Sequence, residues 1–277
     1  MNKYLRLMRF HKPIGIFLLL WPTLWAVWLA GHGHPDISMV FVFVVGVIVM
    51  RSAGCVINDF ADVHFDKYVA RTCDRPLATG EITKKQALVL FSILMLIAFS
   101  LVLFLNRLTI LLACAAAVIA VIYPFLKRYT HLPQLGIGVA FAFGVPMAFA
   151  AQNNVVTLND WQVFLTAAVW PFMYDTLYAM TDREDDIKVG VKSTAILFGK
   201  YDRLIIGVLQ VVLILLFVQM GFIFQLGSPY FVAILFSGIL FIYQQWLIRD
   251  RNPQACFKAF LNNNWVGMII FFGILLA

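Results

Sequence analysis

The amino-acid sequence predicts an all-α protein that spans a membrane about nine times. The chain has 277 residues, of which 62% are hydrophobic and only 13% are charged, far from the usual balance of a soluble domain. Its apolar residues form continuous runs rather than alternating with period two, which argues against a transmembrane barrel. A helix needs about 20 apolar residues to cross the hydrocarbon core, and these runs reach that length.

Nine runs are long enough to span when some tilt is allowed. In chain order they cover residues 14–31, 37–57, 84–105, 109–126, 135–152, 160–180, 203–222, 228–248 and 257–276. The first run contains Trp and Pro and lacks a small-residue cleavage site, so we expect it to remain in the mature protein. We expect one transmembrane domain over residues 1–277.

The basic residues predict the orientation of these spans. Of the 21 Lys and Arg residues, all but Arg107 fall in the N-terminal stretch and in the even-numbered connections, on one side of the membrane. The positive-inside rule places that side, with the N-terminus, in the cytoplasm. The formal net charge of +7 is thereby explained by topology and anionic lipid contacts, and no nucleic acid is needed as a partner.

Two cytoplasmic connections, residues 58–83 and 181–202, are long and highly charged. The first opens with "NDFADVHFD" and the second with "TDREDD". Each contains two aspartates four residues apart, Asp62 with Asp66 and Asp182 with Asp186, followed by a basic residue with Thr nearby. This recurrence indicates two repeated halves, each with an aspartate-rich motif.

Helical phase predicts that both motifs face one cavity. At 100° per residue, Arg51, Asn58, Asp62 and Asp66 form one stripe, with successive offsets of about 20° to 40°. The second motif behaves similarly, because Asp175, Asp182 and Asp186 fall within about 40° of one another.

Aspartates four residues apart repel each other on a helix, so a compensating cation is expected. Oxygen ligands without Cys favour Mg²⁺, which takes one or two carboxylates and completes its shell with water and phosphate oxygens. The neighbouring basic residues suit the charge of a diphosphate; they are Lys67, Arg71, Arg75, Arg128 and Lys192. A single aspartate pair is usually a solvated helix end, but two phased copies beside basic residues favour a site.

Arg51 lies two turns inside a predicted span. An ionisable residue at that depth is a candidate functional residue, and the alternative is a side chain that snorkels to the interface.

These motifs resemble those of the UbiA family of intramembrane prenyltransferases. The match rests on "NDFADVHFD", which fits the family's NDxxDxxxD motif, and on "DREDD", which fits its second, DxxxD motif. The longer strings "HKPIGIFLLLWPTLWA", "YPFLKRYTHLPQ" and "ACFKAFLNNNWVG" resemble the bacterial branch that prenylates 4-hydroxybenzoate.

The resemblance implies nine helices around a central cavity with a polar cap on the cytoplasmic side of the bacterial inner membrane. It also implies transfer of a polyprenyl group from polyprenyl diphosphate to carbon 3 of 4-hydroxybenzoate, with release of diphosphate, in ubiquinone biosynthesis. No obligate protein partner is evident.

The resemblance assigns roles to individual residues. The four aspartates, Asp62, Asp66, Asp182 and Asp186, are expected to be catalytic by holding Mg²⁺, with Asn58 as a neutral ligand or orienting group. Arg51 is the candidate for the acceptor carboxylate. The residues expected to hold the diphosphate are Arg71, Arg75, Tyr123, Lys127, Arg128 and Lys192.

Two other functions remain open from the sequence. One is a prenyltransferase of the same family with a different acceptor, such as homogentisate, a naphthoate or haem. The other is a divalent-cation or organic-anion transporter, although coupling charges in transporters usually lie near the bilayer midplane and these motifs lie at one face.

Overall fold

The computed structural model describes residues 2–69 and 71–277. Within them the chain consists of helices and connections and contains no strand, so the predicted all-α class is confirmed. The helices are α1 (Lys3–Leu7), α2 (Ile14–Ala30), α3 (Ile37–Asp62), α4 (Lys84–Val102), α5 (Arg107–Ile122), α6 (Pro133–Ala142), α7 (Gly144–Asn153), α8 (Leu158–Val189), α9 (Thr194–Phe198), α10 (Asp202–Ile223), α11 (Ser228–Leu247) and α12 (Pro253–Leu275). Four short 3₁₀ turns lie between them: η1 (Asp66–Tyr68), η2 (Tyr123–Arg128), η3 (Gly199–Tyr201) and η4 (Ile248–Asp250).

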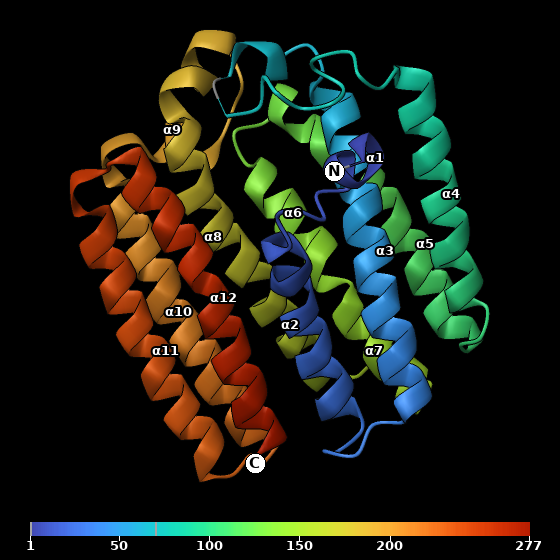
Figure 1. The fold of residues 1–277 in the computed structure, drawn as a ribbon. Coiled ribbons are helices and arrows are strands. Elements are labelled where there is room, and N and C mark those ends of the chain that lie inside the picture. The colour runs from blue at the N-terminus through green and yellow to red at the C-terminus, as the bar shows by residue number, and fades with distance from the viewer. Residues whose placement is uncertain (1, 70) are drawn as a thin grey trace.

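The long helices run side by side in one bundle (Figure 1). The α4 and α5 helices form one edge and α10, α11 and α12 the other, while α2 and α6 lie between them (Figure 1). The longest connections gather at one end of the bundle, which we call the motif end because both acidic motifs lie there. The C-terminus lies at the opposite end (Figure 1).

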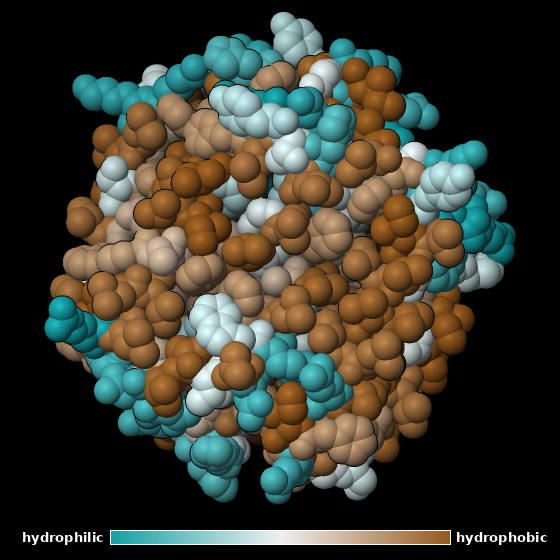
Figure 2. Space-filling model, turned by 180° about the vertical axis from the view of Figure 1, so that it is seen from behind, coloured by the Kyte–Doolittle hydropathy of each residue, from teal (hydrophilic) through white to brown (hydrophobic). Residues whose placement is uncertain are grey.

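Six segments of the described chain are long and apolar enough to cross a membrane, which makes this an integral membrane protein. They are Ile37–Asp62, Lys84–Val102, Arg107–Arg128, Pro133–Asn153, Thr194–Ile223 and Ser228–Asp250. An apolar band lies between polar ends on the face seen in Figure 2, as such segments require. Helices also cover the other three predicted runs, as α2, α8 and α12.

Three predicted boundaries are wrong, each for an identifiable reason. The run 135–152 is two helices, α6 and α7, separated at Phe143. The ring of Pro146 has no N–H to donate to the carbonyl of residue 142 and crowds that carbonyl, which interrupts the helix there.

The α3 and α8 helices continue beyond the apolar runs and carry the motif residues out of the hydrocarbon. Asn58, Asp62, Asp182 and Asp186 therefore lie on helices rather than in loops. The α3 helix ends at Asp62, so the predicted helical stripe does not reach Asp66, which lies in η1.

Aromatic side chains connect the α2, α8 and α10 helices in the core. The Trp25 ring lies 5.1 Å from the Trp170 ring and 5.6 Å from the Phe217 ring. Both indole N–H groups donate to α12, from Trp25 to the Gly267 carbonyl and from Trp170 to Asn263. Polar groups buried in an apolar environment require such partners. These contacts hold α2, α8, α10 and α12 together as the rigid wall of the molecule.

By contrast, α4 and α5 are only lightly enclosed. In their most apolar stretches, 17% of the α4 residues and 11% of those in the segment that begins with α5 are buried, against 39% in α3. Their remaining surface is left to the lipid.

Candidate active site

A cavity of about 440 Å³ opens at the motif end of the bundle. Its walls come from α2, α3, α6, α8 and α12 and from the long connections. All of the predicted site residues line it except Arg128; they are Arg51, Asn58, Asp62, Asp66, Arg71, Arg75, Tyr123, Lys127, Asp182, Asp186 and Lys192. The folded chain therefore brings both acidic motifs and their basic neighbours to one space.

Arg128 lies elsewhere. Its guanidinium donates a hydrogen bond to the Ala61 carbonyl near the end of α3, and it stacks over Phe65 and Phe125. It satisfies a carbonyl at the helix terminus instead of lining the cavity.

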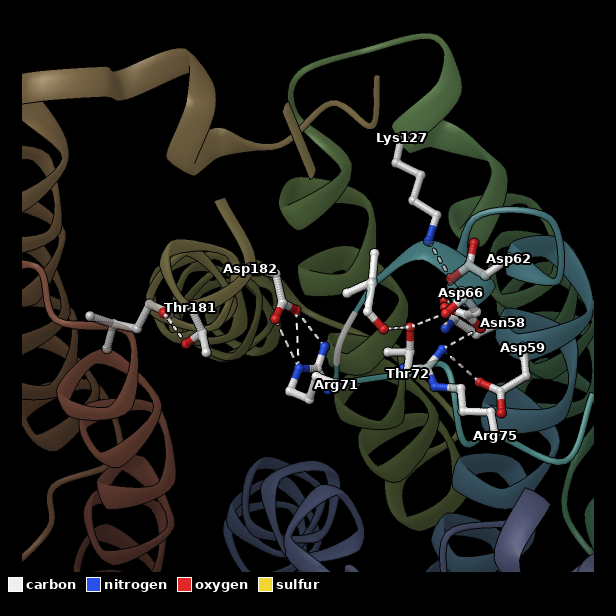
Figure 3. A network of polar contacts seen from close by, with 12 residues as sticks. Asn58, Asp59, Asp62, Asp66, Arg71, Thr72, Arg75, Lys127, Thr181 and Asp182 are labelled. Carbon is white, nitrogen blue, oxygen red and sulfur yellow. Dashed lines mark hydrogen bonds and ion pairs between the residues drawn. The ribbon is translucent and has the colours of Figure 1, made fainter. Parts of the chain in front are cut away.

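The first acidic motif is buried and held by basic side chains from other segments (Figure 3). Asp62 forms an ion pair with Lys127, and its Oδ2 accepts a hydrogen bond of 3.2 Å from the Asn58 amide. Its Oδ1 is buried and has no hydrogen-bond partner in the described part of the chain. A carboxylate held by one oxygen with the other unsatisfied is suited to receive an additional cation.

Arg75 connects the remaining aspartates of this motif. Its Nη1 lies 3.1 Å from Asp59 and 2.7 Å from Asp66, and Arg75 is therefore the reason that Asp66 turns towards the cavity after α3 ends. Burial raises the pKa of Asp66 to about 6, aided by the nearby charges of Asp62 and Asp59 and opposed by Arg75.

The second acidic motif has fewer partners. Asp182 accepts hydrogen bonds from Arg71, at 2.9 Å from Nε, and the Arg71 guanidinium also lies 4.4 Å from the centre of the Tyr178 ring. These contacts form a separate group beside the first motif (Figure 3). Asp186 is half-buried, and its side chain forms no hydrogen bond or ion pair with the described residues. Asp185 points to the surface, where it pairs with Lys188 at 3.1 Å.

The motif carboxylates do not form a metal site by themselves. Nowhere in residues 2–69 and 71–277 are three His, Cys, Asp or Glu side chains grouped closely enough to hold an ion. Basic side chains face Asp62, Asp66 and Asp182 instead. The donor set, however, is entirely oxygen, and the unpartnered Asp62 Oδ1 and the unpaired Asp186 are both available. These residues fit a hard divalent cation that takes one or two carboxylates and fills its shell with other oxygens.

Arg51 enters the cavity from α3, below the acidic motifs. Its Nη1 lies 3.0 Å from the Cys55 sulfur, and its Nε is buried without a hydrogen-bond partner. A Cβ atom at Gly15 would lie only 2.4 Å from the guanidinium, so the close approach of Arg51 to α2 requires glycine there. A buried guanidinium with free N–H groups is suited to bind a planar anion such as a carboxylate.

The sequence analysis missed the contribution of the N-terminal segment. Arg6, Arg9, His11 and Lys12 also line the cavity. Arg9 lies 2.5 Å from the buried Asp59. Its φ of 60° is unusual for a residue other than glycine, which indicates that tertiary contacts hold it in place. The segment had been explained by topology alone, and no spacing pattern linked it to the motifs.

Comparison with known proteins adds to this geometry. Residues 19–272 match the model of the UbiA prenyltransferase family. A protein of Coxiella burnetii named 4-hydroxybenzoate octaprenyltransferase is 57% identical over 277 residues, which cover 100% of this chain and 96% of the relative.

Solved structures share the fold. The apo structure of a UbiA homolog from Aeropyrum pernix K1 superposes with a TM-score of 0.81 at 23% identity, over 94% of this chain and 97% of that one. A UbiA homolog from Archaeoglobus fulgidus bound to GPP and Mg²⁺ gives a TM-score of 0.73 at 17% identity, over 100% of both chains.

Proposed function

The chain belongs to the UbiA prenyltransferase family, and we propose that it transfers a polyprenyl group from polyprenyl diphosphate to carbon 3 of 4-hydroxybenzoate. The observation that carries the proposal is the convergence of two acidic motifs, their basic partners and the buried Arg51 on one cavity. The full-length similarity to a 4-hydroxybenzoate octaprenyltransferase supports this acceptor. The step belongs to ubiquinone biosynthesis.

We propose that Asp62, Asp66, Asp182 and Asp186 hold Mg²⁺ when the donor binds. A bound Mg²⁺ supplies electrophilic neutralisation of the leaving diphosphate. The Archaeoglobus homolog, described as bound to GPP and Mg²⁺, supports the choice of metal. Asn58 orients Asp62 through its 3.2 Å hydrogen bond, which leaves Oδ1 directed away from Lys127.

The basic residues of the cavity bind the departing group. When the allylic carbon–oxygen bond breaks, its electron pair goes to the diphosphate, and fixed positive charges stabilise that developing anion. Arg71, Arg75, Lys127 and Lys192 line the cavity beside the aspartates, and Tyr123 adds a hydroxyl. Lys192 is positioned by backbone and side-chain bonds to η2, from its N–H to the Lys127 carbonyl and from Nζ to the Tyr129 carbonyl.

Arg51 orients the acceptor. Its free guanidinium N–H groups bind the acceptor carboxylate, so that the carbon beside the phenol faces the allylic cation. The new carbon–carbon bond then forms, and the proton on carbon 3 leaves to restore the aromatic ring. The apolar surroundings exclude water, which would otherwise capture the cation.

We further propose nine spans, with α6 and α7 together forming one, and with α2, α8 and α12 added to the six most apolar segments. The basic residues support a cytoplasmic N-terminus and motif end in a bacterial inner membrane. The two motif-bearing helices, α3 and α8, support the view that one domain arose from two repeated halves.

Incubation of the purified protein with 4-hydroxybenzoate, a polyprenyl diphosphate and Mg²⁺, followed by mass analysis, tests the proposal. We expect a product one prenyl chain heavier than the acceptor, together with diphosphate. Homogentisate and a naphthoate, assayed in parallel, test the acceptor. Product with either of these and none with 4-hydroxybenzoate would contradict our assignment.

A further inference from the structure

A second cavity, of about 190 Å³, lies deeper in the bundle between α2, α3, α4, α5, α6 and α7. Side chains without charge line all of it, and Thr23 is one of the few polar ones. The Thr23 hydroxyl donates to the Leu19 carbonyl at 2.9 Å, which leaves it no need of a ligand. We call this space the apolar pocket. Its chemistry suits a hydrocarbon and offers nothing to a polar headgroup.

The apolar pocket continues the active-site cavity along the same helices. On α2 the lining passes from Gly15 to Leu19, one turn further from the motif end. On α3 it passes from Arg51 to Val47, again one turn. Where α5 meets η2, it passes from Tyr123 to Ala120. The apolar pocket therefore lies directly beneath the polar cavity.

The shape of the apolar pocket comes from small residues. A Cβ atom at Gly46 would meet no heavy atom within 4 Å, so open space lies beside that part of α3. Across the pocket, α5 contributes alanines at positions 113, 116, 117 and 120. Along α3 the lining extends from Met50 to Val42, which is about 12 Å at 1.5 Å per residue. The pocket is long and narrow, as an extended chain requires.

We propose that the hydrocarbon chain of the polyprenyl diphosphate lies in the apolar pocket while its diphosphate occupies the cavity above. This inference rests on the proposed function. Lipid is as apolar as the pocket, so the benefit is guidance of the chain rather than removal from water. A chain directed down this path leaves the side of the cavity near Arg51 free for the acceptor. The lightly enclosed α4 and α5 form the outer wall, through which a long chain can pass into the bilayer.

The ratio of kcat/KM for octaprenyl diphosphate to kcat/KM for geranyl diphosphate tests this placement. Gly46→Phe fills the open space, and we expect this ratio to fall about tenfold, as for other changes in apolar pockets that read chain length. Gly238→Phe is the matched control, because a Cβ atom at Gly238 of α11 also meets nothing within 4 Å and Gly238 lines neither cavity. The control is expected to leave the ratio unchanged.

A second pair of variants protects the test if Gly46→Phe does not fold. Ala117→Phe on α5 enters the apolar pocket, whereas the adjacent Val118, 58% exposed, faces outward. We expect Ala117→Phe to lower the ratio and Val118→Phe to leave it unchanged. Equal ratios in all folded variants, or equal losses in pocket variants and controls, would overturn the tail site. Failure of the unchanged protein to prenylate with either donor would instead contradict the proposed function.

Photocrosslinking distinguishes the donor chain from a membrane lipid. An octaprenyl diphosphate analogue with a photoreactive group within its chain should label peptides of α4 and α5, and unlabelled octaprenyl diphosphate should compete. Labelling confined to α10 and α11 would place the chain elsewhere. Competition by phospholipid as strong as by the unlabelled donor would assign the pocket to a lipid acyl chain and overturn the inference.

Discussion

The two acidic motifs share a pattern in sequence but differ in their surroundings. In the first, Asp59, Asp62 and Asp66 are all buried, and each has a basic partner. In the second, Asp182 pairs with Arg71, while Asp186 has no ion pair among the described residues. The Asp182 side chain is also more exposed than that of Asp62, at 14% against 4%.

This difference indicates a division of labour. The basic partners organise the first motif before any ligand arrives, since removing a charge from water is costly unless it is paired. The second motif retains carboxylate oxygen that a cation and a diphosphate can use. Four experiments test this division, beginning with the one expected to have the largest effect.

Removal of one carboxylate from either motif is expected to have the largest effect. Asp62→Ala and Asp182→Ala should each lower kcat by about a thousandfold, because the leaving diphosphate loses its electrostatic stabilisation. Single-turnover assays with a long-chain donor measure this. Asp185→Ala is the control, since Asp185 lies in the same motif but pairs with Lys188 at the surface. Near-normal turnover in either variant, or full activity in EDTA, would refute the metal mechanism.

Removal of the basic partners should separate the two motifs. Arg71→Ala deprives Asp182 of the ion pair that the structure gives it, and we expect a loss in kcat of about a hundredfold. Lys127→Ala should cost less, because Asp62 keeps its bond from Asn58 and Arg75 remains beside Asp66. Steady-state kinetics on both variants measure the order. The opposite order would show that the first motif depends more on its cation.

Arg51 should affect the acceptor and not the donor. Loss of a charged hydrogen-bonding group is worth about 1.5 to 3 kcal/mol, so Arg51→Ala should raise the KM for 4-hydroxybenzoate at least about tenfold. The KM for the polyprenyl diphosphate should change much less. Arg51→Lys should recover part of the loss, because an ammonium lacks the planar fork. If the donor KM rises more than the acceptor KM, Arg51 belongs with the diphosphate residues.

The smallest effect concerns pH and the first motif. The pKa of Asp66 is raised to about 6, above its ordinary value of 3.8, chiefly by burial. As the pH falls through about 6, Asp66 takes up a proton, and because a metal ligand must be deprotonated, Mg²⁺ affinity should fall. Calorimetric titration of Mg²⁺ at about pH 5 and pH 7 should show a difference of up to tenfold. Asp66→Asn should remove most of it; an unchanged pH dependence in that variant would assign the proton elsewhere.

The same group affects stability in the opposite sense. The folded protein holds the Asp66 proton more tightly than the unfolded chain does, so between about pH 4 and pH 6 its contribution to stability decreases as the pH rises. Metal-free Asp66→Asn should therefore show a weaker dependence of melting temperature on pH in this window.

Local patterns in the sequence predicted much of the site. The aspartates recur at a spacing of four, and one turn of helix separates them, so a correct helix assignment was enough to place Asn58 with Asp62 and Asp182 with Asp186. The same reasoning failed at Asp66, where the helix has ended, and at Arg128, which binds the Ala61 carbonyl. Nothing local linked Arg9 to Asp59, which is 50 residues away.

The sequence by itself determined that this is a helical membrane protein with two phased acidic motifs. Backbone groups in lipid must be satisfied within each segment, so long apolar runs become helices whatever surrounds them. Only the tertiary structure decided which cation faces which aspartate, why Gly15 stands opposite Arg51, and where an apolar pocket lies beneath the site. Those features join residues far apart in the chain, and they depend on how side chains of packed helices fit together, which no single segment encodes.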